Sequence, residues 1–370
     1  MKSLVAWASS HLATRDASLE HTALEHRGSA LNALKASIDQ NELSSEMCLA
    51  IAMVFCSMDS ISDMSGSWYH HLLGGAAALG QSGGVSSSSE LKNPISVHAQ
   101  LSRIEGAWLL RNFAYHDALM SVTLDCRPLI TGHYWATTDS AWVDPYFGLA
   151  SRIIYLISQI SVLCANLTQS VGSSIDLPKS TYIAHGPPTV EASASKSHPS
   201  AQLQFEPSSF ADAYDIEAEL LNWNCPDGFV DSPLGLLAEA YRSAALLHLY
   251  RTLRRHEADV NGQLRHKISQ QVSSICDIVA QMPDGCLEEC TLLFPLFIAG
   301  GEAVSSTHIE SICKKMEMIN QYRHFRNVNQ ALEVLNDLWR LRFSGASGTN
   351  NREIDWLDIT KSRNIKLAIT

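Results

Sequence analysis

Three adjacent polar residues, Tyr115, His116 and Asp117, offer an acid, a base and a carboxylate that could orient the base. They lie in LLRNFAYHDALMSVTL, where the apolar spacing predicts a helix. Adjacent helical residues point about 100° apart, so the three side chains should diverge instead of meeting at one reacting atom. With His71 and Asp144, they support only an alternative hypothesis, an enzyme with an apolar substrate cavity.

No standard catalytic motif strengthens that alternative. The sequence has no Walker phosphate loop and no HExxH, and neither a Rossmann glycine fingerprint nor a GxSxG elbow follows a strand, since GQSGG at 80–84 lies in a Gly- and Ser-rich segment. We therefore predict no catalytic residues and no cofactor, and an enzyme is the less favoured hypothesis.

The apolar segment LLFPLFIAGGEA supports two interpretations. Its proline interrupts a helical pattern, and its paired glycines allow another helix or a ligand to approach closely. The first interpretation is tight helix packing; the second is a pocket for a small apolar metabolite. In WYHHLLGGAAAL, a histidine beside a core tryptophan is more often a hydrogen-bonded core residue than a ligand. The predicted ligand-binding set is Trp68, His71, Phe294, Phe297, Gly300 and Gly301.

The nine cysteines do not form a metal-binding pattern. There is no CxxC, and Cys286 and Cys290, which could share one helix face, have no second pair to complete a tetrahedral zinc site. Several others have apolar neighbours, as reduced core cysteines do. We predict no metal.

The formal net charge of −11, with a pI of about 5.7, disfavours direct contact with nucleic acid, because an acidic surface repels phosphates. The main basic cluster, Arg251 with Arg254, Arg255 and His256, has helical spacing and is typical of a solvated face. No apolar run reaches the roughly 20 residues that cross a bilayer, so we expect no membrane partner.

Helical periodicity runs through most of the chain, and no alternating strand pattern or βαβ rhythm is present. We expect helices over about 100–123 and from Asp144-Pro145 onward, and Ser44 should cap the helix that follows it. The fold class is all-α, an array of about a dozen packed helices arranged as hairpins.

Two segments interrupt this pattern. Residues 80–89 (GQSGGVSSSS) are typical of a loop, and residues 172–209 are rich in Pro, Ser and Ala, the composition of a disordered, flexible insertion. The predicted organisation is an N-terminal helical half over 1–171, the insertion over 172–209, and a C-terminal half of the same domain over 210–370.

Several segments, taken in order, resemble the fungal-specific transcription factor domain that follows a Zn2Cys6 cluster, in the branch that includes sterol-sensing regulators. The segments are HRGSALNALKASI, WYHHLLGGAAAL, LLRNFAYHDALMSVTL, DPYFGLASRIIYLISQI, IEAELLNW, EAYRSAALLHLYRTL, LFPLFIAGGEA and ALEVLNDLW. They span roughly residues 26–339. The two closely spaced cysteine groups of the zinc cluster are missing, and Gly301 stands where the family tends to have a cysteine.

The resemblance implies a transcription regulator of the nucleus that forms a homodimer or pairs with another transcription factor, and that senses a small apolar metabolite. Without the cluster, the chain is expected not to read DNA by itself. In the sterol-sensing relatives the helical domain looks like the receptor part, and the resemblance carries that role over only to the PLFIAGGEA region.

Overall fold

The computed structural model describes residues 1–62, 65–80, 104–136, 143–144, 146–173, 207–256, 262–344 and 354–370. Over these ranges the chain forms thirteen α-helices and two short 3-10 helices, and the only β-pairing is an isolated bridge between Asp144 and Gly148. The predicted all-α class and the number of helices are confirmed. The predicted loop over 80–89 apart from its first residue, and the predicted insertion apart from its first two and last three residues, lie outside the described residues.

The first six helices are α1 (Lys2–Ala13), α2 (Glu20–Asp39), α3 (Ser45–Ser62), α4 (Trp68–Ala78), α6 (Ile104–Leu124) and α7 (Ser151–Ser173), with η1 (Ala17–Leu19) between α1 and α2. The others are α8 (Pro207–Asn222), α9 (Pro233–His256), α10 (Gln263–Gln281), η2 (Leu287–Thr291), α11 (Leu293–Glu302), α12 (Ser306–Arg323), α13 (Arg326–Phe343) and α14 (Trp356–Ser362).

Local sequence explains where several helices begin. The Ser44 hydroxyl accepts a hydrogen bond from the Met47 amide at 3.2 Å, so the predicted cap of α3 is confirmed. Pro295 falls in the first turn of α11, where its missing N–H leaves no helical bond unmade, and it does not break the helix.

The predicted start of a helix at Asp144-Pro145 is wrong, because α7 begins at Ser151. The Asp144 carboxylate instead accepts bonds from the Tyr146 and Phe147 amides at 2.8 and 2.9 Å, which holds a turn. The Asp144 side chain can cap such a turn as well as a helix, and the local sequence does not distinguish the two.

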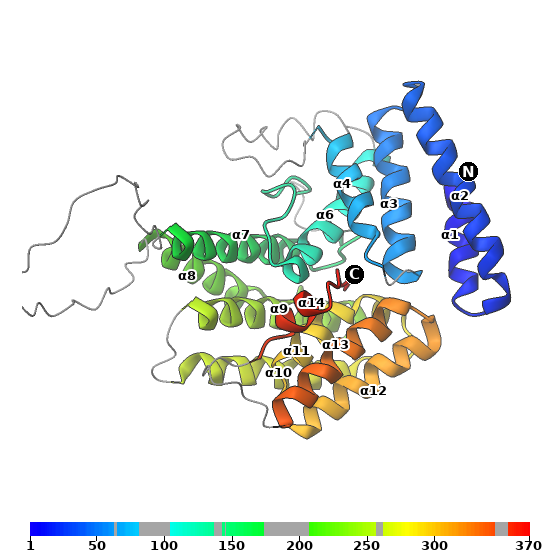
Figure 1. Ribbon diagram of the computed structural model, residues 1–370. Coiled ribbons are helices and arrows are strands. Elements are labelled where there is room, and N and C mark those ends of the chain that lie inside the picture. The colour runs from blue at the N-terminus through cyan, green and yellow to red at the C-terminus, as the bar shows by residue number, and fades with distance from the viewer. Residues whose placement is uncertain are drawn as a thin grey trace, which may run out of the picture.

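Consecutive helices pack as hairpins, most extensively α1 with α2, α3 with α4, and α9 with α10. The helix α9 also contacts α7, α8 and α11, and buried residues surround it on every side, as expected for the central helix of an array. One hydrophobic core runs from Leu49 to Ile369, so helices of both predicted halves share it. Figure 1 shows α9 and α14 at the middle of the molecule, with α1 and α2 at one edge.

The last described segment, residues 354–370, returns to this centre (Figure 1). The backbone carbonyl of Leu367 accepts a bond from the Thr123 hydroxyl at 2.8 Å, and that of Lys366 accepts one from the Trp68 indole at 3.0 Å. Because α4 and α6 lie far away in sequence, this segment ties the C-terminal end of the chain to helices of the N-terminal half.

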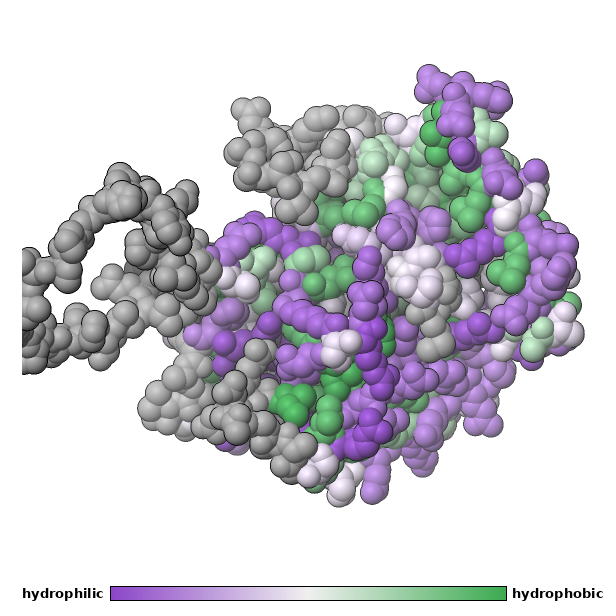
Figure 2. Space-filling view, in the orientation of Figure 1, coloured by the Kyte–Doolittle hydropathy of each residue, from purple (hydrophilic) through white to green (hydrophobic). Residues whose placement is uncertain are grey.

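Two helical stretches, Ser45–Ser62 and Ser151–Gln169, are long and apolar enough to cross a membrane. Both pack into the interior, and core helices of soluble proteins pass the same test, so they are weak evidence for a membrane span. Hydrophilic residues cover much of the face in Figure 2, and hydrophobic ones gather over α3 and α4.

Gly235, near the start of α9, provides a test of this packing. An added Cβ would lie 1.9 Å from the Phe229 carbonyl oxygen, so we expect Gly235→Ala to lower the free energy of unfolding by at least about 1–3 kcal/mol. In α2, a Cβ at Gly28 would meet no atom within 4 Å. The matched Gly28→Ala variant should therefore gain about 0.5–1 kcal/mol, because alanine loses less backbone entropy. Equal effects in urea titrations would contradict this account.

Candidate functional site

The last turns of α9 present three arginines, Arg251, Arg254 and Arg255, towards the centre of the molecule. The prediction of a solvated face is wrong for this cluster. The Arg251 side chain is only 1% exposed, and His256, the last residue of α9, is partly buried. Spacing along the chain shows which cations lie on one face. It does not show that acidic residues from remote segments cover that face.

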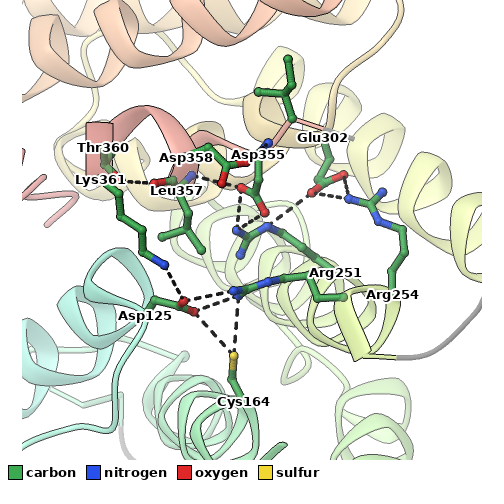
Figure 3. Close-up of polar contacts among 12 residues, drawn as sticks. Asp125, Cys164, Arg251, Arg254, Glu302, Asp355, Leu357, Asp358, Thr360 and Lys361 are labelled. Carbon is green, nitrogen blue, oxygen red and sulfur yellow. Dashed lines mark hydrogen bonds and ion pairs between the residues drawn. The ribbon is translucent and has the colours of Figure 1, made fainter. Parts of the chain in front are cut away.

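Arg251 pairs with two carboxylates at once (Figure 3). Its terminal nitrogen Nη2 donates to both oxygens of Asp355, at 2.8 and 2.7 Å, while its Nε lies 3.4 Å from Glu302. Its guanidinium also stacks over the Trp356 ring, 4.5 Å from the centroid. A buried cation is stable only when it is paired and hydrogen-bonded in this way.

Asp355 has a second role, as the N-cap of α14. Its side chain accepts a bond from the Leu357 amide at 3.2 Å, and the Asp358 side chain accepts one from the Asp355 amide at 2.9 Å, which completes a capping box. Burial opposes ionisation of Asp355, but the Arg251 charge outweighs it and lowers the pKa of the carboxyl. The start of α14 therefore depends on Arg251.

Glu302, the last residue of α11, is shared between two arginines. Its two oxygens lie 3.0 and 2.8 Å from Nη2 of Arg254, in addition to the contact with Arg251. Burial raises the pKa of Glu302 against the opposing effect of both arginines. This carboxylate anchors the end of α11 to α9.

Arg255 forms the third pair, with Asp125 just after α6. Two parallel bonds of 2.8 and 3.0 Å join them, and Lys361 of α14 lies 3.3 Å from the same carboxylate. Burial of Asp125 opposes ionisation, but Arg255 and Lys361 hold its pKa well below the usual range. The Cys164 sulfur of α7 lies 3.7 Å from both Asp125 and Arg255, and burial raises the pKa of this thiol.

We call these residues the central charge network: Asp125, Arg251, Arg254, Arg255, Glu302, Asp355 and Lys361. They come from four separate parts of the chain: the end of α6, α9, α11, and α14 with its N-cap. The pairs link positions 48 to 236 residues apart, so sequence reasoning missed the network. The only signal was three arginines at i, i+3 and i+4 directly after the mostly apolar stretch AALLHLY.

The four predicted ligand residues of α11 are fully buried and closely packed. Phe294 stacks on Tyr241, with 5.6 Å between ring centroids, and Phe297 meets the edge of Trp356 at 5.1 Å. An added Cβ would lie 2.7 Å from Leu335 at Gly300 and 2.6 Å from Trp356 at Gly301. Both glycines therefore accommodate neighbouring side chains, as the packing interpretation expected, and ligand binding stays a prediction.

The other two predicted ligand residues, Trp68 and His71, lie on α4 with different neighbours. His71 Nε2 is 3.2 Å from the buried Asp59 carboxylate, and its ring stacks on Phe55 at 5.0 Å. Arg27 of α2 and Ser67 reach the same carboxylate, at 3.0 and 2.6 Å. His71 thus belongs to a polar cluster around Asp59 that joins α2, α3 and α4.

The polar residues of the enzyme hypothesis also have separate partners. The Tyr115 and Tyr241 hydroxyls share a hydrogen bond of 2.9 Å, whereas Asp117 accepts bonds from the Leu129 and Ile130 amides at 2.7 and 3.0 Å. Burial raises the pKa of Asp117 to about 7 and lowers that of His116 to about 4. The divergence predicted for adjacent helical residues is confirmed.

Among the described residues, no group of three or more His, Cys, Asp or Glu is placed to hold a metal ion. A shallow groove of about 270 Å³ lies between α7 and α8, where Arg152, Tyr155, Asp215 and Glu219 are among the lining residues. Charged and polar side chains make up more than half of its lining, which differs from the mostly apolar pockets that hold drug-sized ligands.

Removing the central cation should destabilise the fold strongly. Arg251→Met leaves Asp355 and Glu302 buried with one partner fewer, so we expect a loss of about 3–5 kcal/mol in unfolding free energy. The control is Arg340→Met, because Arg340 pairs with Asp337 on the surface and is 73% exposed. That change should alter stability by less than about 1 kcal/mol. Similar urea midpoints for the two variants would rule out a central role for Arg251.

A buried histidine near the network should make stability depend on pH. Burial and then the Arg251 charge lower the pKa of His248 to about 3, from 6.5 for the free side chain. Between these values the unfolded chain binds a proton that the folded chain does not, so stability falls as the pH drops from 6.5. Between pH 7 and pH 5 this residue should contribute a loss of about 2 kcal/mol.

His248→Gln should remove that contribution, so its unfolding free energy should fall less than that of the wild type between pH 7 and pH 5. The control His26→Gln changes an exposed side chain and should keep the wild-type slope. Parallel curves for His248→Gln and the wild type in urea titrations would show that His248 is protonated equally in both states.

The chain was compared with protein families, with curated proteins and with solved structures. The family model described as fungal specific transcription factor domain matches residues 1–370, the full length of the chain. Neither a curated protein nor a solved structure matches. The resemblance seen in the ordered helical segments is thereby confirmed, and the chain belongs to the fungal specific transcription factor domain family.

Proposed function

We propose that this chain is the regulatory module of a fungal transcription factor, that it acts in the nucleus, and that it works as a homodimer or with a transcription-factor partner. Membership of the family over residues 1–370 supports the regulatory role. The net charge of −11 supports a module that leaves DNA contact to another part or protein, because an acidic surface repels phosphates.

The central charge network is the observation that carries the proposal of a regulatory role. Replacing a buried ion pair with well-packed apolar residues often leaves the folding stability unchanged or increases it. A need for stability alone therefore does not explain why such pairs are present. Here the pairs fix the position of α14 and of the segment 354–370 against both halves of the fold. We propose that regulation acts by docking and releasing this segment.

The predicted metabolite site fits this proposal at one place. Trp356 occupies the space next to Phe297 and Gly301. The Arg251 guanidinium stacks over the ring of the same Trp356. A small apolar ligand on α11 would have to replace this indole. Ligand binding would then weaken the cation–π contact of Arg251 and favour release of α14.

A reporter assay tests the regulatory role. The full chain is fused to a heterologous DNA-binding domain in yeast, and reporter output is measured for the wild type and for Asp355→Asn, which weakens the pair with Arg251. We expect the wild-type fusion to change reporter output and Asp355→Asn to alter that output by at least about threefold at equal protein level, which corresponds to a shift of about 0.7 kcal/mol between two states.

The matched control is Asp212→Asn, at an exposed carboxylate of α8, which should match the wild type. A wild-type fusion that leaves the reporter unchanged would contradict the regulatory role. Equal output from Asp355→Asn and the wild type would contradict the role of the docked segment.

A further inference from the structure

Residues 365–370 (IKLAIT) follow α14 without helical or strand structure, yet they reach the interior of the fold. Leu367, Ala368 and Ile369 are each at most 2% exposed and belong to the main hydrophobic core. We call these residues the 365–370 segment. Its apolar side chains are buried against helices from other parts of the chain, so the way in which those helices hold it defines a binding site.

Three side chains, one each from α4, α6 and α13, donate hydrogen bonds to backbone carbonyls of the segment. The bonds run from Trp68 to Lys366 at 3.0 Å, from Thr123 to Leu367 at 2.8 Å, and from Asn327 to Ala368 and Thr370 at 3.3 and 3.2 Å. Every peptide has backbone carbonyls, and in a helix these groups are bonded internally. The donors therefore select a non-helical peptide and do not depend on its side chains.

The start of α4 completes the site. Gly66 has a φ of 77°, and an added Cβ there would lie 2.8 Å from the Cβ of Lys366, so the glycine lets the segment approach closely. The Lys366 ammonium lies 4.3 Å from the centroid of the Tyr69 ring, a cation–π contact. We call Gly66, Trp68, Tyr69, Thr123 and Asn327 the segment site.

We infer that the segment site binds a segment of a partner protein with the chemistry of residues 366–369: a non-helical backbone with a cation followed by aliphatic, small and aliphatic side chains. The 365–370 segment then acts as a tethered competitor that keeps the site filled. This inference rests on the release of residues 354–370 in the proposed function, and it names what that release makes available. The three donors and the Tyr69 ring would meet the partner as they meet the chain's own segment.

A different protein is a better occupant than a second copy of this chain. In a second copy, the 365–370 segment already fills its own site. Exchange of segments between two copies would replace each set of contacts with an identical set, and nothing would offset the translational and rotational freedom that association removes. A partner without a site of its own gains all these contacts on binding.

A fluorescent peptide tests the site in the full chain. Its sequence is NIKLAIT, that of residues 364–370, and its binding is measured by fluorescence anisotropy. The wild type should bind it weakly, because a tethered segment competes at a high effective concentration. Ile369→Asp places a charge at a fully buried position and weakens the tethered segment, so it should raise the affinity for the peptide at least about tenfold.

A milder variant and a donor variant complete the set. Ile369→Ala adds no charge and should also raise the affinity for the peptide, and melting curves check that each variant is folded. In the Ile369→Asp chain, Asn327→Asp replaces the donating amide with an acceptor of the same shape and should lower the affinity at least about tenfold. The matched control is Asn329→Asp, the same change at an exposed position of α13, which should leave the affinity unchanged.

Three results would overturn the inference. The first is a folded Ile369→Asp or Ile369→Ala chain that binds the peptide no more tightly than the wild type. The second is equal affinity in the Asn327→Asp and Asn329→Asp chains, which would place the peptide elsewhere. The third is a wild-type dimer in sedimentation that Ile369→Asp dissociates, because that result would assign the segment site to a second copy of this chain.

The reporter assay separates this inference from the regulatory role. Reporter output that responds to Asp355→Asn, in a chain whose Ile369 variants bind no peptide, would show that the regulatory role holds and that the segment site takes no partner. Peptide binding that depends on Asn327, in a fusion that leaves the reporter unchanged, would show that the site exists and the regulatory role is wrong.

Discussion

Burial of the Arg251 guanidinium sets the main constraint on this structure. A cation with 1% of its side chain exposed loses nearly all contact with water, so the protein must provide its hydrogen bonds and its counter-charges. Asp355, at the start of α14, accepts its hydrogen bonds, and Glu302 of α11 supplies a second counter-charge. The positions of these two helices relative to α9 are therefore coupled through one side chain.

The other arginines extend this coupling to the N-terminal half. Arg255 holds Asp125 at the end of α6, and Lys361 holds the same carboxylate from α14. Ion pairs thus hold the segment 354–370 at its start. Near its end, the Thr123 hydroxyl donates a hydrogen bond to the backbone carbonyl of Leu367. A change that weakens one pair alters the surroundings of the others, which is the property that a two-state regulatory element needs.

The N-terminal helices follow a different principle. The α1 and α2 hairpin has its own small cluster with α3, built from Ala6, Ala30, Phe55 and Met58, and stands apart from the main core. An ion pair between Arg27 and the buried Asp59 also holds it to α3. Small residues allow close contact between helices but bury little apolar area, and Leu12, Leu24 and Ile38 of this hairpin are exposed.

The sequence by itself determined the all-α class, the approximate helix positions, the Ser44 cap and the family, because helical periodicity, capping and segment order are local properties of the chain. It predicted the start of α7 too early, since Asp144 caps a turn as readily as a helix. The tertiary structure alone decided that Arg251 is buried, that Gly301 faces Trp356 and that His71 pairs with Asp59. Gly301 and Trp356 are 55 positions apart and Arg251 and Asp355 more than 100, and no periodic pattern along the chain encodes which remote side chains meet.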